Sequence, residues 1–172
     1  MKIVVKFGGS SLASAEQFKK VADIIHADPH RRFVVPSAPG KRFDGDTKVT
    51  DMLYGCYDLA EAGKDFDGAL ADIKARYDEI IEGLGLDLTL DKEFETIHEQ
   101  FRLKAGGNYA ASRGEYLNGI VLAYYLGFEF IDAATVIRFD DAGNFEADRT
   151  DLILSSRLKD VDYAVVPGFY WA

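Results

Sequence analysis

The stretch VVKFGGSS, residues 4–11, joins the end of an expected strand to a glycine turn. Residues 2–7 form a short run rich in β-branched side chains, which is typical of a strand. Lys6 lies near the end of this strand, and Gly8 and Gly9 follow it. Glycine can adopt positive φ and leaves backbone N–H groups accessible. Consecutive N–H groups beside a lysine form a site for an anion such as a phosphoryl group. A plain turn is the alternative interpretation.

Strand and helix signals alternate along the rest of the chain. Further strands are expected at 33–35, 128–131 and 164–166, each a short apolar run ended by turn residues or a change of pattern. Helical periodicity predicts the segments between them, at 14–28, 50–62, 66–83, 94–101, 109–126 and 151–159. Strands separated by helices predict an α/β fold with a mostly parallel sheet and helices on both faces.

Several local signals predict caps and turns. Ser14 and Gln17 have the spacing of a capping box at the start of the first helix. Thr47 or Thr50 is expected to cap the second helix. Residues 134–150 alternate between apolar and polar side chains around a polar turn, which predicts a hairpin.

Composition limits the classes of protein to which the chain can belong. A length of 172 residues, with 48% hydrophobic and 28% charged residues, is typical of one globular domain. The net charge of -9 disfavours nonspecific nucleic-acid binding, so no nucleic-acid partner is expected. The single cysteine, Cys56, excludes an internal disulfide and suits a reducing compartment. No apolar run approaches the ~20 residues of a membrane span. We therefore expect a cytoplasmic protein with no membrane partner and, since its histidines are scattered, no metal site.

Two further loops carry polar side chains toward the same edge of the predicted sheet. Ser37 follows the second expected strand, and Thr50 opens the next helix, where an anion is favoured. Arg113 and Glu115 stand in a charged opening to an otherwise apolar helix. A carboxylate there could bind an amino group, and an arginine could bind a carboxylate. A solvated first turn of the helix is the alternative.

Four stretches, in order along the chain, together resemble the aspartokinases of the amino-acid kinase superfamily. They are KFGGSS (6–11), VVPSAPG with KVTDML (34–40 and 48–53), SRGEYLNG (112–119) and VVPGFYWA (165–172). Each is weak alone, but four ordered matches span almost the whole chain. The resemblance implies a three-layer αβα sandwich. It also implies transfer of the γ-phosphoryl group of ATP, with Mg²⁺, to the side-chain carboxylate of aspartate, the first step toward lysine, threonine and methionine.

The resemblance also implies roles for individual residues. Lys6 would hold the transferring phosphoryl group, and the loop that contacts it would consist of Gly8, Gly9 and Ser10. Aspartate would be bound by Ser37 and Thr50, with its α-ammonium on Glu115 and with Arg113 nearby. A carboxylate nucleophile is already ionised at neutral pH, so no general base is needed.

The resemblance is incomplete in two respects. Asn118 stands where the SxGExLS motif usually has its final serine. The family's RGGSD motif, adenine-binding segment and ACT domains would all lie beyond Ala172. Residues 1–172 are therefore expected to be the amino-acid-binding N-terminal part of a kinase domain, truncated and inactive alone. An uncovered edge at 164–167, with Phe169, Tyr170 and Trp171, is expected to make the chain self-associate as a homo-oligomer.

Two other functions stay open. Acetylglutamate, uridylate and carbamate kinases of the same superfamily also open with a lysine and a glycine pair, although the spellings KFGGSS, KVTD and SRGE argue against them. A non-enzymatic fragment that binds an amino acid or a partner is the alternative from another class.

Overall fold

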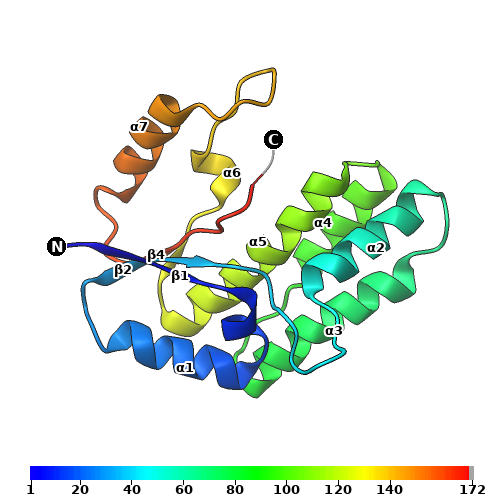
Figure 1. The fold of residues 1–172 in the computed structure, drawn as a ribbon, viewed down its shortest axis with the longest axis horizontal. Coiled ribbons are helices and arrows are strands. Elements are labelled where there is room, and N and C mark those ends of the chain that lie inside the picture. Colours follow the sequence, from blue (N-terminus) through cyan, green and yellow to red (C-terminus); the bar gives the residue numbers. More distant parts are fainter. Residues whose placement is uncertain (171–172) are drawn as a thin grey trace.

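A computed structural model describes residues 1–170 of the chain (Figure 1). Its strands are β1 (Ile3–Phe7), β2 (Arg31–Pro36), β3 (Glu129–Phe130) and β4 (Ala164–Val165). A short 3-10 helix, η1, covers Gly9–Leu12. The α-helices are α1 (Ala15–His26), α2 (Val49–Glu61), α3 (Asp67–Gly83), α4 (Asp91–Arg102), α5 (Gly107–Leu126), α6 (Ala133–Val136) and α7 (Ala147–Leu158). The expected strands and helices are therefore present, with boundaries shifted by a few residues. Trp171 lies outside the described residues.

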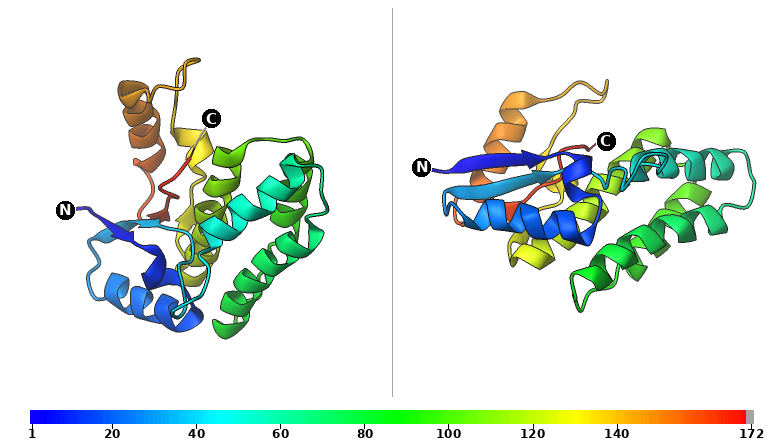
Figure 2. Two further views of the ribbon diagram at one scale, coloured as in Figure 1. Left: turned by 45° about the vertical axis from the view of Figure 1, so that its right-hand side comes forward. Right: turned by 60° about the horizontal axis from the view of Figure 1, so that its bottom comes forward.

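The four strands form one parallel sheet in the order β1-β2-β4-β3. Helices α1 and α5 lie against one face of this sheet, and α7 lies over the other (Figure 2). The expected α/β fold with a parallel sheet between helical layers is confirmed. Parallel strands place their carboxyl ends at one edge, so the loops after β1 and β2 lie side by side.

Side-chain alternation along the central strands divides the core between the two faces of the sheet. Val34 and Val165 belong to the larger cluster, which also contains buried residues of α1 and α5. Phe33 and Ala164 belong to a smaller cluster with Val136 and other residues near α7. Successive residues of a strand point to opposite faces, so two core clusters follow directly from the apolar runs of β2 and β4.

Helices α2, α3, α4 and α5 form a bundle beside the sheet (Figure 1). Its interior contains Tyr77, Phe94, Phe101 and Leu117, all nearly or completely buried. Helix α5 is shared between the bundle and the sheet, which explains why so much of its surface is apolar. Within residues 1–170, none of the helices has both the length and the apolar character needed to cross a membrane.

Strand β4 is an interior strand, so the prediction of an exposed edge at 164–167 was wrong. It pairs with β2 on one side and β3 on the other, and Ala164 and Val165 are fully buried. The crossover through α6 and α7 returns the chain between two strands already laid down. The edges of the sheet are therefore β1 and β3. Phe169 is partly exposed, at 38%, as expected.

The hairpin predicted at 134–150 is confirmed only around its turn, where the Asp140 N–H donates to the Asn144 carbonyl and the Glu146 N–H donates to the Arg138 carbonyl. The side chain of Asp132 accepts a hydrogen bond from the Ala134 N–H, which caps helix α6 instead. In the described residues, the hairpin is reduced to one antiparallel bridge between Phe139 and Phe145, after which α7 begins. The alternating side chains therefore mark extended backbone only near the turn, while the two ends of the predicted hairpin lie in α6 and α7.

The two capping predictions had different outcomes. The Ser14 side chain accepts a hydrogen bond from the Gln17 N–H, as expected. Helix α2 is instead preceded by Lys48, without a side-chain cap, so neither Thr47 nor Thr50 is its N-cap. The N–H of Val49 donates to the Pro39 carbonyl over 3.1 Å, so the preceding loop replaces the side-chain cap. Thr50 therefore keeps its hydroxyl for other contacts.

Candidate functional site

A cavity of about 550 Å³ opens at the carboxyl ends of β1 and β2. Four parts of the chain line it: the turn after β1, the loop after β2, the start of α2 and one residue of α5. The lining residues are Gly9, Ser10, Ser37, Ala38, Pro39, Gly40, Lys41, Lys48, Thr50 and Glu115. Five of the predicted site residues thus surround one space, although they are far apart in the sequence.

The turns after β1 and β2 pack directly against each other. The Gly40 N–H donates to the Gly9 carbonyl over 2.8 Å, and the Ser37 N–H donates to the Phe7 carbonyl over 2.9 Å. A Cβ on Gly9 would lie 2.8 Å from the Ala38 carbonyl oxygen, and one on Gly40 would lie 2.6 Å from the Gly9 carbonyl carbon. Both positions therefore require glycine because of close backbone approach.

The positive φ that we expected the first glycine pair to provide is not used. Gly8 has an extended conformation with φ of -76°, and Gly9 is not among the glycines of positive φ. A Cβ on Gly8 would meet no atom within 4 Å. Packing in the described structure therefore requires glycine at position 9 and leaves open space at position 8.

Glu115 is a half-buried carboxylate in the wall of the cavity. Burial raises the pKa of Glu115, and this effect exceeds the opposing effects of the Phe169 N–H, the Lys6 charge and the Gly168 N–H. The turn after β4 thus wraps around the carboxylate with its backbone. A carboxylate that is poorly solvated in this way gains from binding a cation such as an ammonium group.

The backbone N–H groups of Gly168 and Phe169 were not predicted as part of the site. A Cβ on Gly168 would lie 3.3 Å from Oε2 of Glu115 and 2.8 Å from Cγ1 of Val35, so this turn is also packed closely. The signal for it in the sequence is the Pro-Gly pair at 167–168, which begins two residues after the end of β4. Phe169 also lines a smaller space of about 120 Å³ that shares Thr50 and Glu115 with the main cavity.

The position of Glu115 depends on the glycine before it. A Cβ on Gly114 would lie 2.7 Å from the Cβ of Ala38 and 3.2 Å from Cδ1 of Leu53. The buried Tyr77 hydroxyl donates to the Gly114 carbonyl over 2.7 Å. Gly114 therefore allows α5 to approach the loop after β2, which brings Glu115 to the cavity.

Asn118, where the sequence departs from the family motif, contacts the loop after β2. Its side chain is fully buried, and Nδ2 donates to the Ser37 carbonyl over 2.7 Å. Within the described residues, its Oδ1 has no hydrogen-bond partner. Asn118 therefore fixes the backbone of Ser37, a cavity residue, which gives the asparagine a structural role at this position.

The structure does not bring every predicted residue to the cavity. Lys6 and Gly8 are exposed and are not lining residues, although Lys6 is close enough to affect the pKa of Glu115. Arg113 lies elsewhere, stacked on the rings of Tyr109 and Tyr116 at 4.6 Å from each centroid. Side chains two apart on a helix point about 200° apart, so Arg113 and Glu115 face different directions.

Two lysines of the cavity were missed by sequence reasoning. Lys41 and Lys48 stand at either end of a polar stretch, and both line the cavity that Glu115 also lines. Nothing in their local sequence separates them from solvated loop lysines. Their contribution is positive charge in a cavity that also contains a carboxylate, which is an arrangement suited to a ligand with groups of both signs.

Residues 1–170 match the amino acid kinase family along their whole length. The chain belongs to the amino acid kinase family. Aspartokinase 3 of Bacillus subtilis (strain 168) is 35% identical over 186 residues, an alignment that covers 97% of this chain. The crystal structure of Clostridium acetobutylicum aspartate kinase superposes with a TM-score of 0.94 at 47% identity, over 99% of this chain.

A more distant relative shares the fold. Escherichia coli aspartokinase III, solved in complex with aspartate and ADP, superposes with a TM-score of 0.76 at 23% identity over 98% of this chain. The chain spans 40% of the length of each of these three relatives.

Proposed function

We propose that residues 1–172 form the amino-acid-binding part of an aspartate kinase. The reaction transfers the γ-phosphoryl group of ATP to the side-chain carboxylate of aspartate, giving 4-phospho-aspartate and ADP. The observation that carries this proposal is the cavity that joins Glu115 to Lys41, Lys48 and the hydroxyls of Ser37 and Thr50. Aspartate has one ammonium group and two carboxylates, so its charges complement this lining. The relatives named aspartokinase and aspartate kinase support the choice of substrate.

Each side of the substrate has a suitable partner in this proposal. Glu115 binds the α-ammonium, since a partly desolvated carboxylate is stabilised by an adjacent cation. Ser37 and Thr50 donate to a carboxylate of aspartate, and Lys41 and Lys48 add positive charge to the lining of the same cavity. Arg113 faces another small cavity, so we assign it no contact with aspartate.

The phosphoryl group would be placed beside the turn after β1. Lys6 provides a charge that can follow the group as negative charge moves between oxygens, and Gly8, Gly9 and Ser10 provide backbone donors. The aspartate carboxylate attacks the γ-phosphorus, the bond to the β,γ-bridging oxygen breaks, and ADP leaves with that oxygen. The nucleophile is ionised at neutral pH, so no proton has to be removed from it.

Beyond the turn after β1, we assign the described residues no contact with the nucleotide. Within residues 1–170, no group of three or more His, Cys, Asp or Glu side chains is placed to hold a metal ion. We infer that ATP and Mg²⁺ are bound mainly by the additional length found in the relatives, which would also carry the regulatory ACT domains. Residues 1–172 alone are then not expected to turn over.

The pathway, the compartment and the oligomeric state that we propose follow from the same function. Phosphorylation of aspartate is the first step of lysine, threonine and methionine biosynthesis, which takes place in the cytoplasm. Partly exposed Phe169 lies beside the site and leaves an apolar surface that a second copy could cover in a homo-oligomer.

An aspartate-dependent kinase assay on the full-length protein tests the proposal. ADP release should require L-aspartate, and hydroxylamine should trap the acyl phosphate as a hydroxamate. Acetylglutamate, UMP and carbamate should give no release above background. Turnover with one of these three, and none with aspartate, would assign the chain to another branch of the family.

A further inference from the structure

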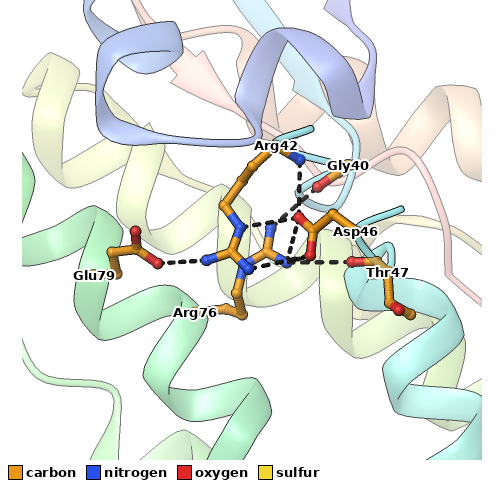
Figure 3. Close-up of polar contacts among 6 residues, drawn as sticks. All are labelled: Gly40, Arg42, Asp46, Thr47, Arg76 and Glu79. Atoms are coloured by element: carbon orange, nitrogen blue, oxygen red, sulfur yellow. Dashed lines mark hydrogen bonds and ion pairs between the residues drawn. The ribbon is translucent and has the colours of Figure 1, made fainter. Parts of the chain in front are cut away.

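A buried arginine outside the cavity contacts both ends of the loop that carries the cavity lysines. Arg76 lies on α3 and is 5% exposed. Its Nη2 donates to the Gly40 carbonyl over 3.1 Å, and its Nη1 donates to the Thr47 carbonyl over 3.2 Å (Figure 3). One guanidinium group thus joins two backbone positions that flank residues 41–46.

The same guanidinium also contacts a buried carboxylate within the loop. Nη1 of Arg76 lies 3.2 Å from Oδ2 of Asp46, whose side chain is 8% exposed. Asp46 accepts further hydrogen bonds from the backbone N–H and the Nε of Arg42, each over 2.9 Å. Arg42 in turn pairs with Glu79 of α3 over 2.7 Å (Figure 3). Two cations and two anions therefore connect the loop to α3 in one network.

The buried pair of Arg76 and Asp46 within this network is poorly explained by stability alone. Burying charges costs solvation energy, and a buried ion pair is often no more stable than an apolar replacement of the same size. Its geometry, however, is specific. A planar guanidinium offers donors in fixed directions, which an ammonium or an apolar side chain does not. Within the described residues, every hydrogen bond that Arg76 donates goes to residues 40–47. These residues contain or adjoin three lining residues of the cavity, Gly40, Lys41 and Lys48.

We propose that Arg76 is a positioning residue that sets the shape of the aspartate cavity through residues 40–48. By holding Gly40 and Thr47 together, it fixes where Lys41 and Lys48 enter the lining. Gly40 also donates to the Gly9 carbonyl, so the same contact reaches the turn after β1. Arg76 itself does not line the cavity. The loop thereby owes its conformation to a helix that lies outside the site.

The role in substrate binding rests on the proposed function, whereas the effect on the loop does not. Arg76→Met removes the guanidinium group and its donors but keeps an unbranched apolar side chain in the buried position. Lys74→Met is the matched control, since Lys74 is another cation of α3 that pairs with Asp78 and Asp91 and does not touch the loop. Arg76→Lys and Asp46→Asn are the milder variants if Arg76→Met does not fold.

Two measurements on the full-length protein test the proposal. Hydrogen exchange of residues 41–47 should accelerate at least tenfold in Arg76→Met, while exchange in α2 and α5 stays as in the wild type. The KM for aspartate should rise at least fivefold, and the KM for ATP should change less than twofold. Lys74→Met should alter neither quantity. The KM for aspartate in Arg76→Lys should stay close to that in Arg76→Met.

Three outcomes would overturn the proposal. Exchange in 41–47 equal to that of the wild type would show that the loop holds its conformation without Arg76. Acceleration spread equally over α2 and α5 would show a role in global stability only. Equal changes in the KM for aspartate and for ATP would remove the specific link to the amino-acid cavity. If the wild type does not phosphorylate aspartate, the proposed function fails, and the exchange measurement still decides whether Arg76 positions the loop.

Discussion

The Gly40 N–H donates to the Gly9 carbonyl over 2.8 Å, so the turns that follow two neighbouring parallel strands are joined backbone to backbone. Each glycine removes a side chain that would otherwise separate the turns. The cavity lies where these turns meet the start of α2 and the carboxylate of Glu115. Its shape thus depends on close packing of backbone as much as on the side chains that line it.

Substitution of the glycine pair after β1 should have unequal effects. Gly9→Ala places a Cβ 2.8 Å from the Ala38 carbonyl oxygen, and the resulting strain should cost about 1–3 kcal/mol of unfolding free energy. Gly8→Ala meets no atom within 4 Å and should change stability by less than about 0.5 kcal/mol. Urea denaturation of both variants measures the difference. Equal losses would show that the two turns do not pack as described.

Lys6→Ala should lower kcat strongly in the full-length protein. The proposed role is to stabilise charge on the transferring phosphoryl group, and loss of one such donor typically costs about 2.7–4 kcal/mol of barrier, or roughly 10²–10³ in rate. Folding should be little affected, because Lys6 is exposed. Steady-state kinetics with saturating aspartate and ATP provides the measurement. A decrease in kcat of less than about tenfold, ~1.4 kcal/mol, would exclude this role.

Glu115→Gln should stabilise the ligand-free protein at neutral pH. The pKa of Glu115 is raised in the folded state, mainly by burial, so ionisation is easier in the unfolded chain. Its contribution to stability is full below the unfolded pKa of about 4.3 and is lost as the pH rises through the folded pKa. The wild type should therefore lose stability relative to the variant as the pH rises above about 4.3. Thermal unfolding of both proteins from about pH 4 upward will show whether the wild type becomes less stable than the variant as the pH rises.

Asp46→Asn should have the opposite dependence on pH. The Arg42 side chain, with further N–H donors and Arg76, holds the pKa of Asp46 well below its ordinary value. Its contribution to stability is present above the unfolded pKa of about 3.9 and is lost as the pH falls toward the folded pKa. Removing this partner from Arg76 should cost roughly 3 kcal/mol at pH 7. The difference from the wild type in urea unfolding should shrink below about pH 4; a gap that stays constant with pH would contradict the pairing.

Local patterns predicted most of the elements, because strands β1 and β2 and the long helices carry their own periodicity. The position of β4 could not be read locally, since strand order depends on where the crossover through α6 and α7 returns. Glu115 could be predicted as a site residue because charged residues near the start of an otherwise apolar helix are unusual. Arg113, two residues earlier, was expected nearby but points elsewhere because of the helical turn. The role of Arg76 could not be predicted, since an arginine inside an amphipathic helix normally reaches solvent.

The central claim is that the cavity recognises aspartate by its α-ammonium group on Glu115. Isothermal titration of the full-length protein with L-aspartate and with succinate, which lacks the ammonium group, tests this claim most directly. The wild type should prefer aspartate by at least tenfold, about 1.4 kcal/mol, and Glu115→Gln should lose that preference while its affinity for ATP changes little. Retention of the full preference for aspartate over succinate in Glu115→Gln would contradict the account.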